Sequence, residues 1–361
     1  MKNVYKISAL VLIVIAFVLI IVQSTEKKTQ ISIGAVIPQT GFGEYWGEPV
    51  LAGIKLAESD LKSKYGESRV SVFVEDGQSA VPASVSAAQK LLNINKVNAI
   101  YTEFSGPSNG ISPIVKNAGK AFAYSTFNQK VVEDNEYSIK TFINFEEGCE
   151  KFVKYVNDSS KKILIISSLG NVAPYCEKAL LKFFPRENVR VVDGFVGTDF
   201  RTVLLQNKSF APDYIIPMMY EDGSLALIKQ KSELGIKSII YSYKQDSATE
   251  KILKELPTAY TDGSLYFEVE IDENFANKIK AINPNMTEDD MQGAANSYQS
   301  IMILGNALAQ CPDGSAECVV SNIASQKNLE SAGYKNASIV NRVLVSDLKI
   351  GEVKNGVGVL K

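Results

Sequence analysis

The sequence predicts an α/β fold built from two successive units, each with a parallel central sheet covered by helices. From residue 31 onward, short apolar runs alternate with segments whose apolar residues recur at helical spacing. The same alternation starts again near Glu147. Alternating strands and helices are typical of a parallel sheet with helices on both faces, and a length of 361 residues suits two domains.

The first unit contains five short apolar runs. We expect strands over Ile31–Ile37, Val70–Val74, Val97–Thr102, Ala121–Ser125 and Ser138–Ile143. Helices are expected between them, over Val50–Leu61, about Val81–Leu92 and Pro107–Ala118.

The second unit repeats this order. Strands are predicted over Lys162–Ser168, Val189–Val192, Asp213–Met219 and Ser238–Tyr241. Helices are predicted over Glu147–Val156, Pro174–Phe184 and Ser224–Leu234, the last closed by Gly235.

The remaining chain follows a different pattern, which predicts a return to the first unit. We expect extended segments over Phe267–Ile271, Ser338–Val345 and Val357–Leu360. Helices are expected over Glu273–Ile282, Glu288–Gln310 and about Ala316–Glu330.

Composition excludes several classes of protein. The net charge is -2 with a pI near 5.6, so no basic field is available to hold nucleic acid. The chain has no histidine, which removes the usual Ser-His-Asp and Cys-His nucleophiles and most zinc sites. No nucleophile–base pair or metal cluster is apparent. We therefore expect that the protein is not an enzyme and that it binds no cofactor and no metal.

Four cysteines suit two disulfides in an exported protein. Cys311 and Cys318 close a short polar loop, and Cys149 and Cys176 lie at two predicted helix starts on either side of one strand. Each pair is therefore placed to meet. The alternative is that two or more of the four remain free thiols.

The N-terminus indicates export. Lys2 and Lys6 precede an apolar run over Ile7–Val22, and a polar segment follows. We favour an uncleaved membrane anchor over residues 4–22, with the lysines on the cytoplasmic side. A cleaved signal peptide is the alternative, and both place the rest of the chain outside the cytoplasm.

The turn after the first strand, "TGFGEYWGEP", has two functional interpretations. A dinucleotide fingerprint, G-x-G-x-x-G, matches Gly41 and Gly43, but Trp46 occupies the third position and glycine follows at Gly47. That glycine lets helix and strand pack closely, so a tryptophan there argues against a nucleotide site. We instead expect Tyr45 and Trp46 to form an aromatic ligand wall. A plain connecting loop is the alternative without function.

Two other polar loops follow strands that should end at the same sheet edge. Ser105 precedes a predicted helix start, where free N–H groups and hydroxyls bind carboxylates. The alternative is that Ser105 only caps this helix. Thr126 and Asn128 follow the next strand. Ligands of open α/β sheets bind at such edges, so we expect these loops to form one site.

Several of these motifs occur together in one known family. Ile33-Gly34, Thr40-Gly41 and Trp46-Gly47 stand in order with Pro38, Gly53 and Leu56-Ala57. This order and spacing resemble the leucine/isoleucine/valine-binding family of extracytoplasmic solute-binding proteins. The similarity extends from Ile31 to about Gln310. It departs at Thr102, where the family carries glycine.

The resemblance implies a type I periplasmic-binding-protein fold, in which two Rossmann-like lobes joined by three crossover strands close on an amino acid or amide. By this resemblance, Ser105 and the segment Thr126–Asn128 hold the α-carboxylate and ammonium, Trp46 covers the ligand, and Tyr220 contributes from the second lobe. Gln245, or its neighbour Lys244, stands where many members carry an acid for the ammonium. Asp246 and Glu221 are nearby substitutes, and Tyr45 and Phe127 are further expected contacts.

The same resemblance implies the domain boundaries and the partners. Lobe one is expected over residues 31–143 with about 269–343, and lobe two over 144–268 with about 344–361. Residues 1–30 form the anchor or signal segment. The expected function is capture of an amino acid, branched-chain in type, or an amide for the permease and ATPase of an ABC importer. An extracytoplasmic sensing module with the same fold is the alternative.

Overall fold

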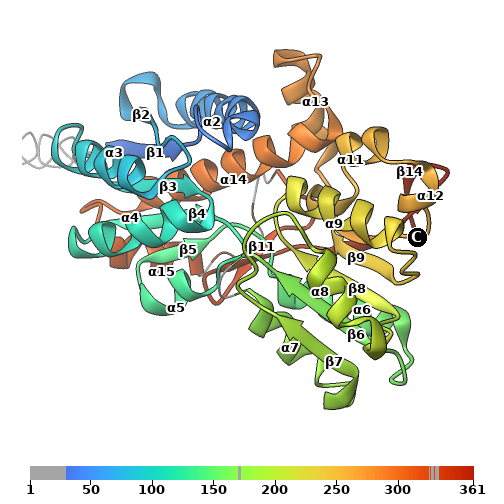
Figure 1. Cartoon of the computed structure of the whole chain (residues 1–361). Coiled ribbons are helices and arrows are strands. Elements are labelled where there is room, and N and C mark those ends of the chain that lie inside the picture. Colours follow the sequence, from blue (N-terminus) through green and yellow to red (C-terminus); the bar gives the residue numbers. More distant parts are fainter. Residues whose placement is uncertain (1–29, 170–171, 325, 327–328, 330–332) are drawn as a thin grey trace, which may run out of the picture.

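Two seven-stranded sheets form the framework of the molecule (Figure 1). The computed structural model describes residues 30–169, 172–324, 326, 329 and 333–361. The first sheet has the order β11 (Ser338–Val340), β12 (Val343–Val345), β5 (Ser138–Lys140), β4 (Ala121–Ser125), β3 (Ala99–Glu103), β1 (Ile31–Ile37) and β2 (Val70–Asp76). The second has the order β14 (Val357–Leu360), β13 (Leu348–Lys354), β10 (Leu265–Val269), β9 (Ile239–Tyr243), β8 (Tyr214–Met218), β6 (Ile163–Ser167) and β7 (Val189–Val192).

Both sheets are mixed rather than purely parallel. Neighbouring strands run parallel from β12 to β2 in the first sheet and from β10 to β7 in the second. The antiparallel pairs lie at one edge of each sheet, where β11 pairs with β12 and where β13 pairs with both β10 and β14. Since β11, β12, β13 and β14 all come after residue 337, the C-terminal segment completes both lobes.

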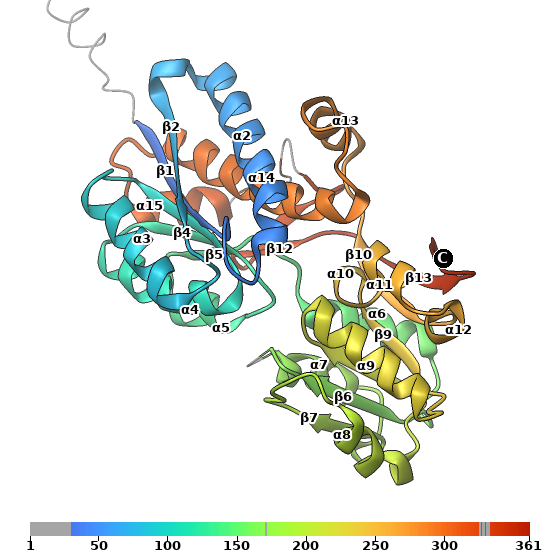
Figure 2. The same ribbon diagram turned by 45° about the horizontal axis from the view of Figure 1, so that its top comes forward.

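Helices cover both faces of each sheet, as Figures 1 and 2 show. The helices of the first lobe are α2 (Glu44–Tyr65), α3 (Val81–Asn93), α4 (Ser105–Asn117), α5 (Lys130–Asp134), α13 (Glu273–Ile282), α14 (Glu288–Gln310) and α15 (Ala316–Ala324). Those of the second are α6 (Phe145–Val156), α7 (Ala173–Leu180), α8 (Arg201–Gln206), α9 (Glu221–Glu233), α10 (Lys244–Ser247), α11 (Glu250–Glu255) and α12 (Thr258–Thr261).

The position of strand β1 in the fold explains why its sequence is almost entirely apolar. Every residue of β1 is buried. Ile33 and Ile37 join the core beneath α2 and α14, whereas Val36 points to the opposite core with Leu91 of α3 and Ile111 of α4. A strand covered on both faces has no solvated side, so a continuous apolar run replaces the alternating pattern.

The chain passes between the two sheets three times. It leaves the first sheet after β5, returns after β10 and leaves again after β12. This topology confirms the predicted two-lobed fold with three crossovers. The exact boundaries proposed for each lobe stay a prediction.

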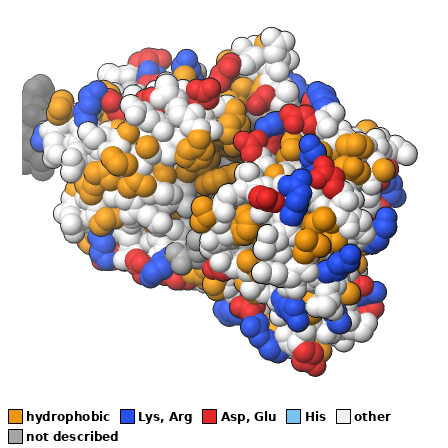
Figure 3. All heavy atoms as spheres, viewed as in Figure 1, with side chains coloured by type: hydrophobic (Ala, Val, Ile, Leu, Met, Phe, Trp, Pro, Cys, Tyr) orange, Lys and Arg blue, Asp and Glu red, His pale blue; other side chains and the backbone are white. Residues whose placement is uncertain are grey.

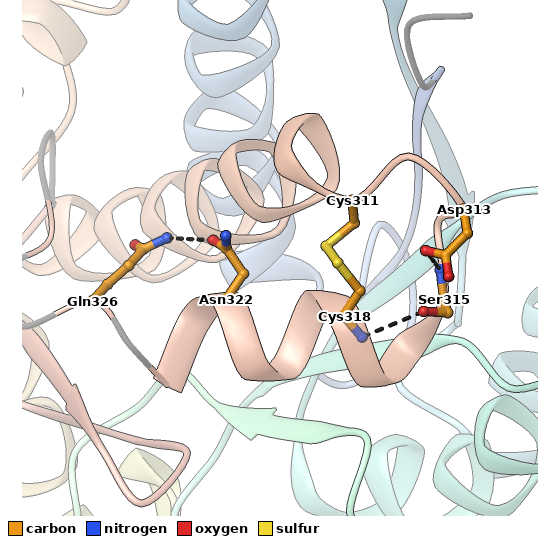
Figure 4. The surroundings of a disulfide bond; sticks show 6 residues. All are labelled: Cys311, Asp313, Ser315, Cys318, Asn322 and Gln326. Carbon is orange, nitrogen blue, oxygen red and sulfur yellow. Dashed lines mark hydrogen bonds between the residues drawn. A yellow bond between two sulfur atoms is a disulfide. The ribbon is translucent and has the colours of Figure 1, made fainter. Parts of the chain in front are cut away.

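Both predicted disulfides are formed, and all four cysteines are therefore paired. Cys149–Cys176 joins α6 to α7 beneath the second sheet. Cys311–Cys318 joins the end of α14 to α15 (Figure 4).

Some predicted elements differ from those observed. The first helix begins at Glu44 rather than Val50, so it contains Trp46 and Pro49. The predicted strand over residues 338–345 is a hairpin, because Asn341 and Arg342 adopt φ values of 50° and 66°, which reverse the chain. Strand β13 and the short helices α5, α8, α10, α11 and α12 were not predicted. These helices have only four to six residues, too few to show a helical period. Strand β13 has seven residues, but charged residues interrupt its apolar ones.

The predicted N-terminal anchor lies outside the described residues. Within the described ranges, no helix combines the length and apolar character needed to cross a bilayer.

Gly53 permits the close packing of α2 against α14. A Cβ atom at Gly53 would lie 2.1 Å from the carbonyl oxygen of Ala294 and 2.3 Å from the Ser297 hydroxyl, and that hydroxyl donates a hydrogen bond to the Val50 carbonyl at 2.8 Å. We expect Gly53→Ala to lower the free energy of unfolding by about 1–3 kcal/mol, because the helices must separate. Chemical denaturation measures this loss.

The matched control is Gly223→Ala in α9. The three atoms nearest to a Cβ at Gly223 all belong to the Met219 side chain, at 3.2–3.4 Å. A side chain can shift where the backbone of Ala294 cannot, so the control should lose less stability than Gly53→Ala. Equal stability of the two variants would show that the α2–α14 contact is not the constraint.

Candidate functional site

A cavity of about 530 Å³ lies between the two lobes, where strands of both sheets end. Figure 3 shows a hollow between the lobes in which hydrophobic side chains gather, with charged side chains on the second lobe beside it. The first lobe contributes residues at or just after the ends of β1, β3, β4 and β5, and the second contributes those of β6, β8 and β9. The carboxyl ends of parallel strands are the usual ligand site in open α/β folds.

Most of the predicted ligand contacts meet in this cavity. Its lining from the first lobe includes Tyr45, Trp46, Ser105, Thr126 and Phe127. From the second lobe it includes Tyr220, Glu221, Gln245 and Asp246. Residues about 200 positions apart in the sequence are therefore brought together, because the strands that precede them end at the same cleft.

Asn128 is placed differently. It is 1% exposed and is not part of the cavity lining. Its side-chain amide donates to the side-chain oxygen Oδ1 of Asn109 at 2.8 Å, and its own Oδ1 accepts from the backbone N–H of Lys130 at 3.0 Å. These bonds hold the segment that carries Thr126 and Phe127.

Trp46 lies in the first turn of α2 rather than in a loop, which corrects the predicted boundary. The glycine that follows it has the packing role that the fingerprint assigns to its last glycine. A Cβ at Gly47 would lie 2.3 Å from the Pro38 carbonyl oxygen. The displaced glycine thus allows the helix to approach the strand exit, and Trp46 is left to line the cavity.

The loop between β3 and α4 presents Ser105 to the cavity. The residue before it, Phe104, has a φ of 64°, an uncommon conformation for a residue with a side chain. No side chain caps α4, so Ser105 does not serve as its cap. Instead, the hydroxyl oxygens of Ser105 and Thr126 lie 2.5 Å apart. This hydroxyl pair stands beside the N-terminus of a helix, where a carboxylate is stabilised.

Aromatic rings from both lobes meet across the cavity. The Tyr220 ring lies 5.8 Å from Phe104 and 6.1 Å from Phe42, centroid to centroid. Tyr220 directly precedes α9 in the second lobe, whereas the two phenylalanines belong to the first. Burial raises the pKa of Tyr220, and the charges of Asp246 and Glu103 raise it further.

Glu103 is a lining residue that sequence reasoning missed. It ends β3, is 3% exposed, and accepts hydrogen bonds from the Tyr101 hydroxyl and from the Trp46 side chain. Burial raises the pKa of Glu103 to about 8, although these two hydrogen bonds oppose the shift. An acidic residue closing an otherwise apolar strand was the signal available in the sequence.

Asp246 is the corresponding buried acid of the second lobe. It lies on α10 with 7% exposure, and its Oδ2 atom has no hydrogen-bond partner among the described residues. Burial raises the pKa of Asp246 well above its usual value, and the nearby Glu221 carboxylate raises it further. An unpartnered buried oxygen facing a cavity is costly unless a ligand group satisfies it.

Comparison with known proteins agrees with this architecture. A family model described as periplasmic binding protein matches residues 30–357, which confirms the resemblance drawn from the sequence. No curated protein gives a significant sequence match.

Solved structures show the same fold. A leucine binding protein, LivK, from Thermotoga maritima has a TM-score of 0.77 at 19% identity, covering 92% of this chain and 97% of that one. LivJ of Streptococcus pneumoniae, in complex with isoleucine, has a TM-score of 0.74 at 17% identity, covering 92% and 100%. A solute binding protein from R. palustris, in complex with benzoate, has a TM-score of 0.73 at 17% identity, covering 92% and 95%. At these identities the likeness shows the fold alone.

Proposed function

We propose that this chain, which belongs to the periplasmic binding protein family, captures a small polar solute between its lobes and delivers it to the permease and ATPase of an ABC importer. The observation that carries the proposal is the cavity itself, because residues at or just after the ends of seven strands in two lobes line it together. The family location is extracytoplasmic, and we propose that residues 4–22 anchor the chain to the membrane. The lobes are proposed to close by hinge motion at the three crossovers.

The solute is proposed to be an amino acid or an amide. Its carboxylate or carbonyl would meet the Ser105 and Thr126 hydroxyls at the N-terminus of α4, and its nitrogen would face Asp246. Tyr45, Trp46, Phe127 and Tyr220 would enclose the carbon skeleton, and Gln245 would add a polar contact. The structural neighbours bind ligands as different as isoleucine and benzoate, so the lining of this chain must decide the ligand.

Trp46 provides the experiment, because it is the single tryptophan of the chain and it lines the cavity. When a solute that binds is titrated in, we expect the intensity or wavelength of the Trp46 fluorescence to change, because the ligand replaces water beside the indole. The screen would contain amino acids, amides, urea and NAD, and thermal shift would report binding independently. Stabilisation by NAD alone would contradict the proposed function.

A further inference from the structure

The cavity lining carries many more acidic than basic side chains. Two carboxyl groups, Glu103 and Asp246, are buried. Five others are less buried, namely Glu221, Asp222, Glu250, Asp289 and Asp290. The single cationic side chain among the described lining residues is Lys251.

Lys251 already forms ion pairs with acids of its own lobe. Its ammonium nitrogen lies 2.6 Å from Asp222 and 3.3 Å from Glu221. It is therefore not available to hold an anionic ligand.

The other less buried acids of the lining have partners as well. Glu250 lies 2.8 Å from the Lys254 ammonium, Asp289 accepts from the Glu250 N–H at 2.9 Å, and Asp290 accepts from the Thr287 hydroxyl at 2.8 Å. Asp246 differs from these acids, because its Oδ2 atom has no hydrogen-bond partner among the described residues. Glu103 accepts hydrogen bonds from Tyr101 and Trp46 but, like Asp246, has no ion-pair partner among the described residues. They lie on opposite lobes, and Tyr220 is within electrostatic range of both.

The apolar part of the lining also suits a cation. Phe42, Tyr45, Trp46, Phe104 and Tyr220 present aromatic rings around the same space. The faces of such rings attract ammonium groups by about 0.5–2 kcal/mol each. The same faces give an anion no stabilisation.

From these observations we infer that the bound solute carries a net positive charge, as an organic amine or a basic amino acid does, with a charged nitrogen held at Asp246. This inference rests on the proposed function and narrows its ligand class. A ligand carboxylate, where present, would use the hydroxyls of Ser105 and Thr126. Its positive groups would then outnumber it, because the described lining holds seven carboxyl groups and one lysine that is already paired. Aromatic acids such as benzoate are expected to bind weakly on the same grounds.

The test compares matched compounds with the purified full-length protein. Lysine and norleucine share a carbon skeleton and differ by one ammonium group, and benzylamine and benzoate have similar shapes with opposite charges. We expect the cation of each pair to raise the melting temperature more and, by calorimetry, to bind at least tenfold more tightly. Tighter binding of norleucine or benzoate would overturn the charge assignment and leave solute binding intact. No binding of any compound in the complete screen would count against both.

Asp246→Asn tests the residue itself, because it removes the charge and keeps the shape. We expect at least a tenfold loss of affinity for the preferred cation, with cooperative unfolding at the parent temperature or above. The control is Asp193→Asn, an exposed aspartate in the second lobe outside the cavity lining, which should change affinity less than twofold. Parental affinity of the Asp246→Asn variant would remove Asp246 from the site.

Discussion

Trp46→Ala is expected to weaken solute binding by about thirtyfold or more, which corresponds to about 2 kcal/mol. Trp46 lines the cavity between the lobes, and its side chain hydrogen-bonds the buried Glu103. The alanine variant loses both the aromatic wall and this donor, so the cavity becomes wider and Glu103 less well satisfied. Calorimetric titration with the best compound of the screen measures the change, since the variant has no tryptophan fluorescence.

Trp46→Phe separates the two roles. Phenylalanine keeps an aromatic ring but cannot donate to Glu103, which then retains only the Tyr101 hydroxyl. We expect an affinity between those of the parent and the alanine variant. Both variants should unfold cooperatively, because Trp46 is only partly buried. Parental affinity of the alanine variant would show that Trp46 takes no part in binding.

Removal of the Cys149–Cys176 disulfide is expected to lower the free energy of unfolding by about 3–4 kcal/mol. Its cysteines are separated by 27 positions, and the entropy of the unfolded chain that a cross-link removes grows with the closed loop. Both cysteines are fully buried, so the double replacement Cys149→Ala and Cys176→Ala avoids introducing polar groups. Denaturant unfolding of this variant against the parent gives the difference.

The second disulfide offers a matched comparison. Cys311 and Cys318 are separated by only 7 positions, so the same chain-entropy relation gives about 2.5 kcal/mol for their removal. The long-loop variant should therefore be the less stable by about 1 kcal/mol. A larger loss from the short loop would mean that packing around Cys311, and not loop closure, dominates.

The site was predictable where a strand end is marked by local sequence. Ser105 and Thr126 each follow a buried strand within two positions, and Trp46 stands in a glycine-rich turn. Glu103 closes a buried strand, which makes it unusual in the sequence, but only contacts made on folding show that it faces the cavity. Asp246 was predicted only as a substitute contact. Its unpartnered oxygen depends on packing between α10 and the rest of the second lobe.

Patterns in the sequence were enough to predict the two α/β lobes and the order of most strands and helices, because strands buried on both faces and helices with one apolar face leave recognisable patterns in the chain. The order of its motifs predicted the family. The cysteine pairs were expected, with free thiols as the alternative. Folding in three dimensions placed Trp46 in a helix, turned Asn128 away from the cavity, and left Glu103 and Asp246 facing it with no ion-pair partner among the described residues. Those properties arise from contacts between residues far apart in sequence, for which a single chain carries no local signal.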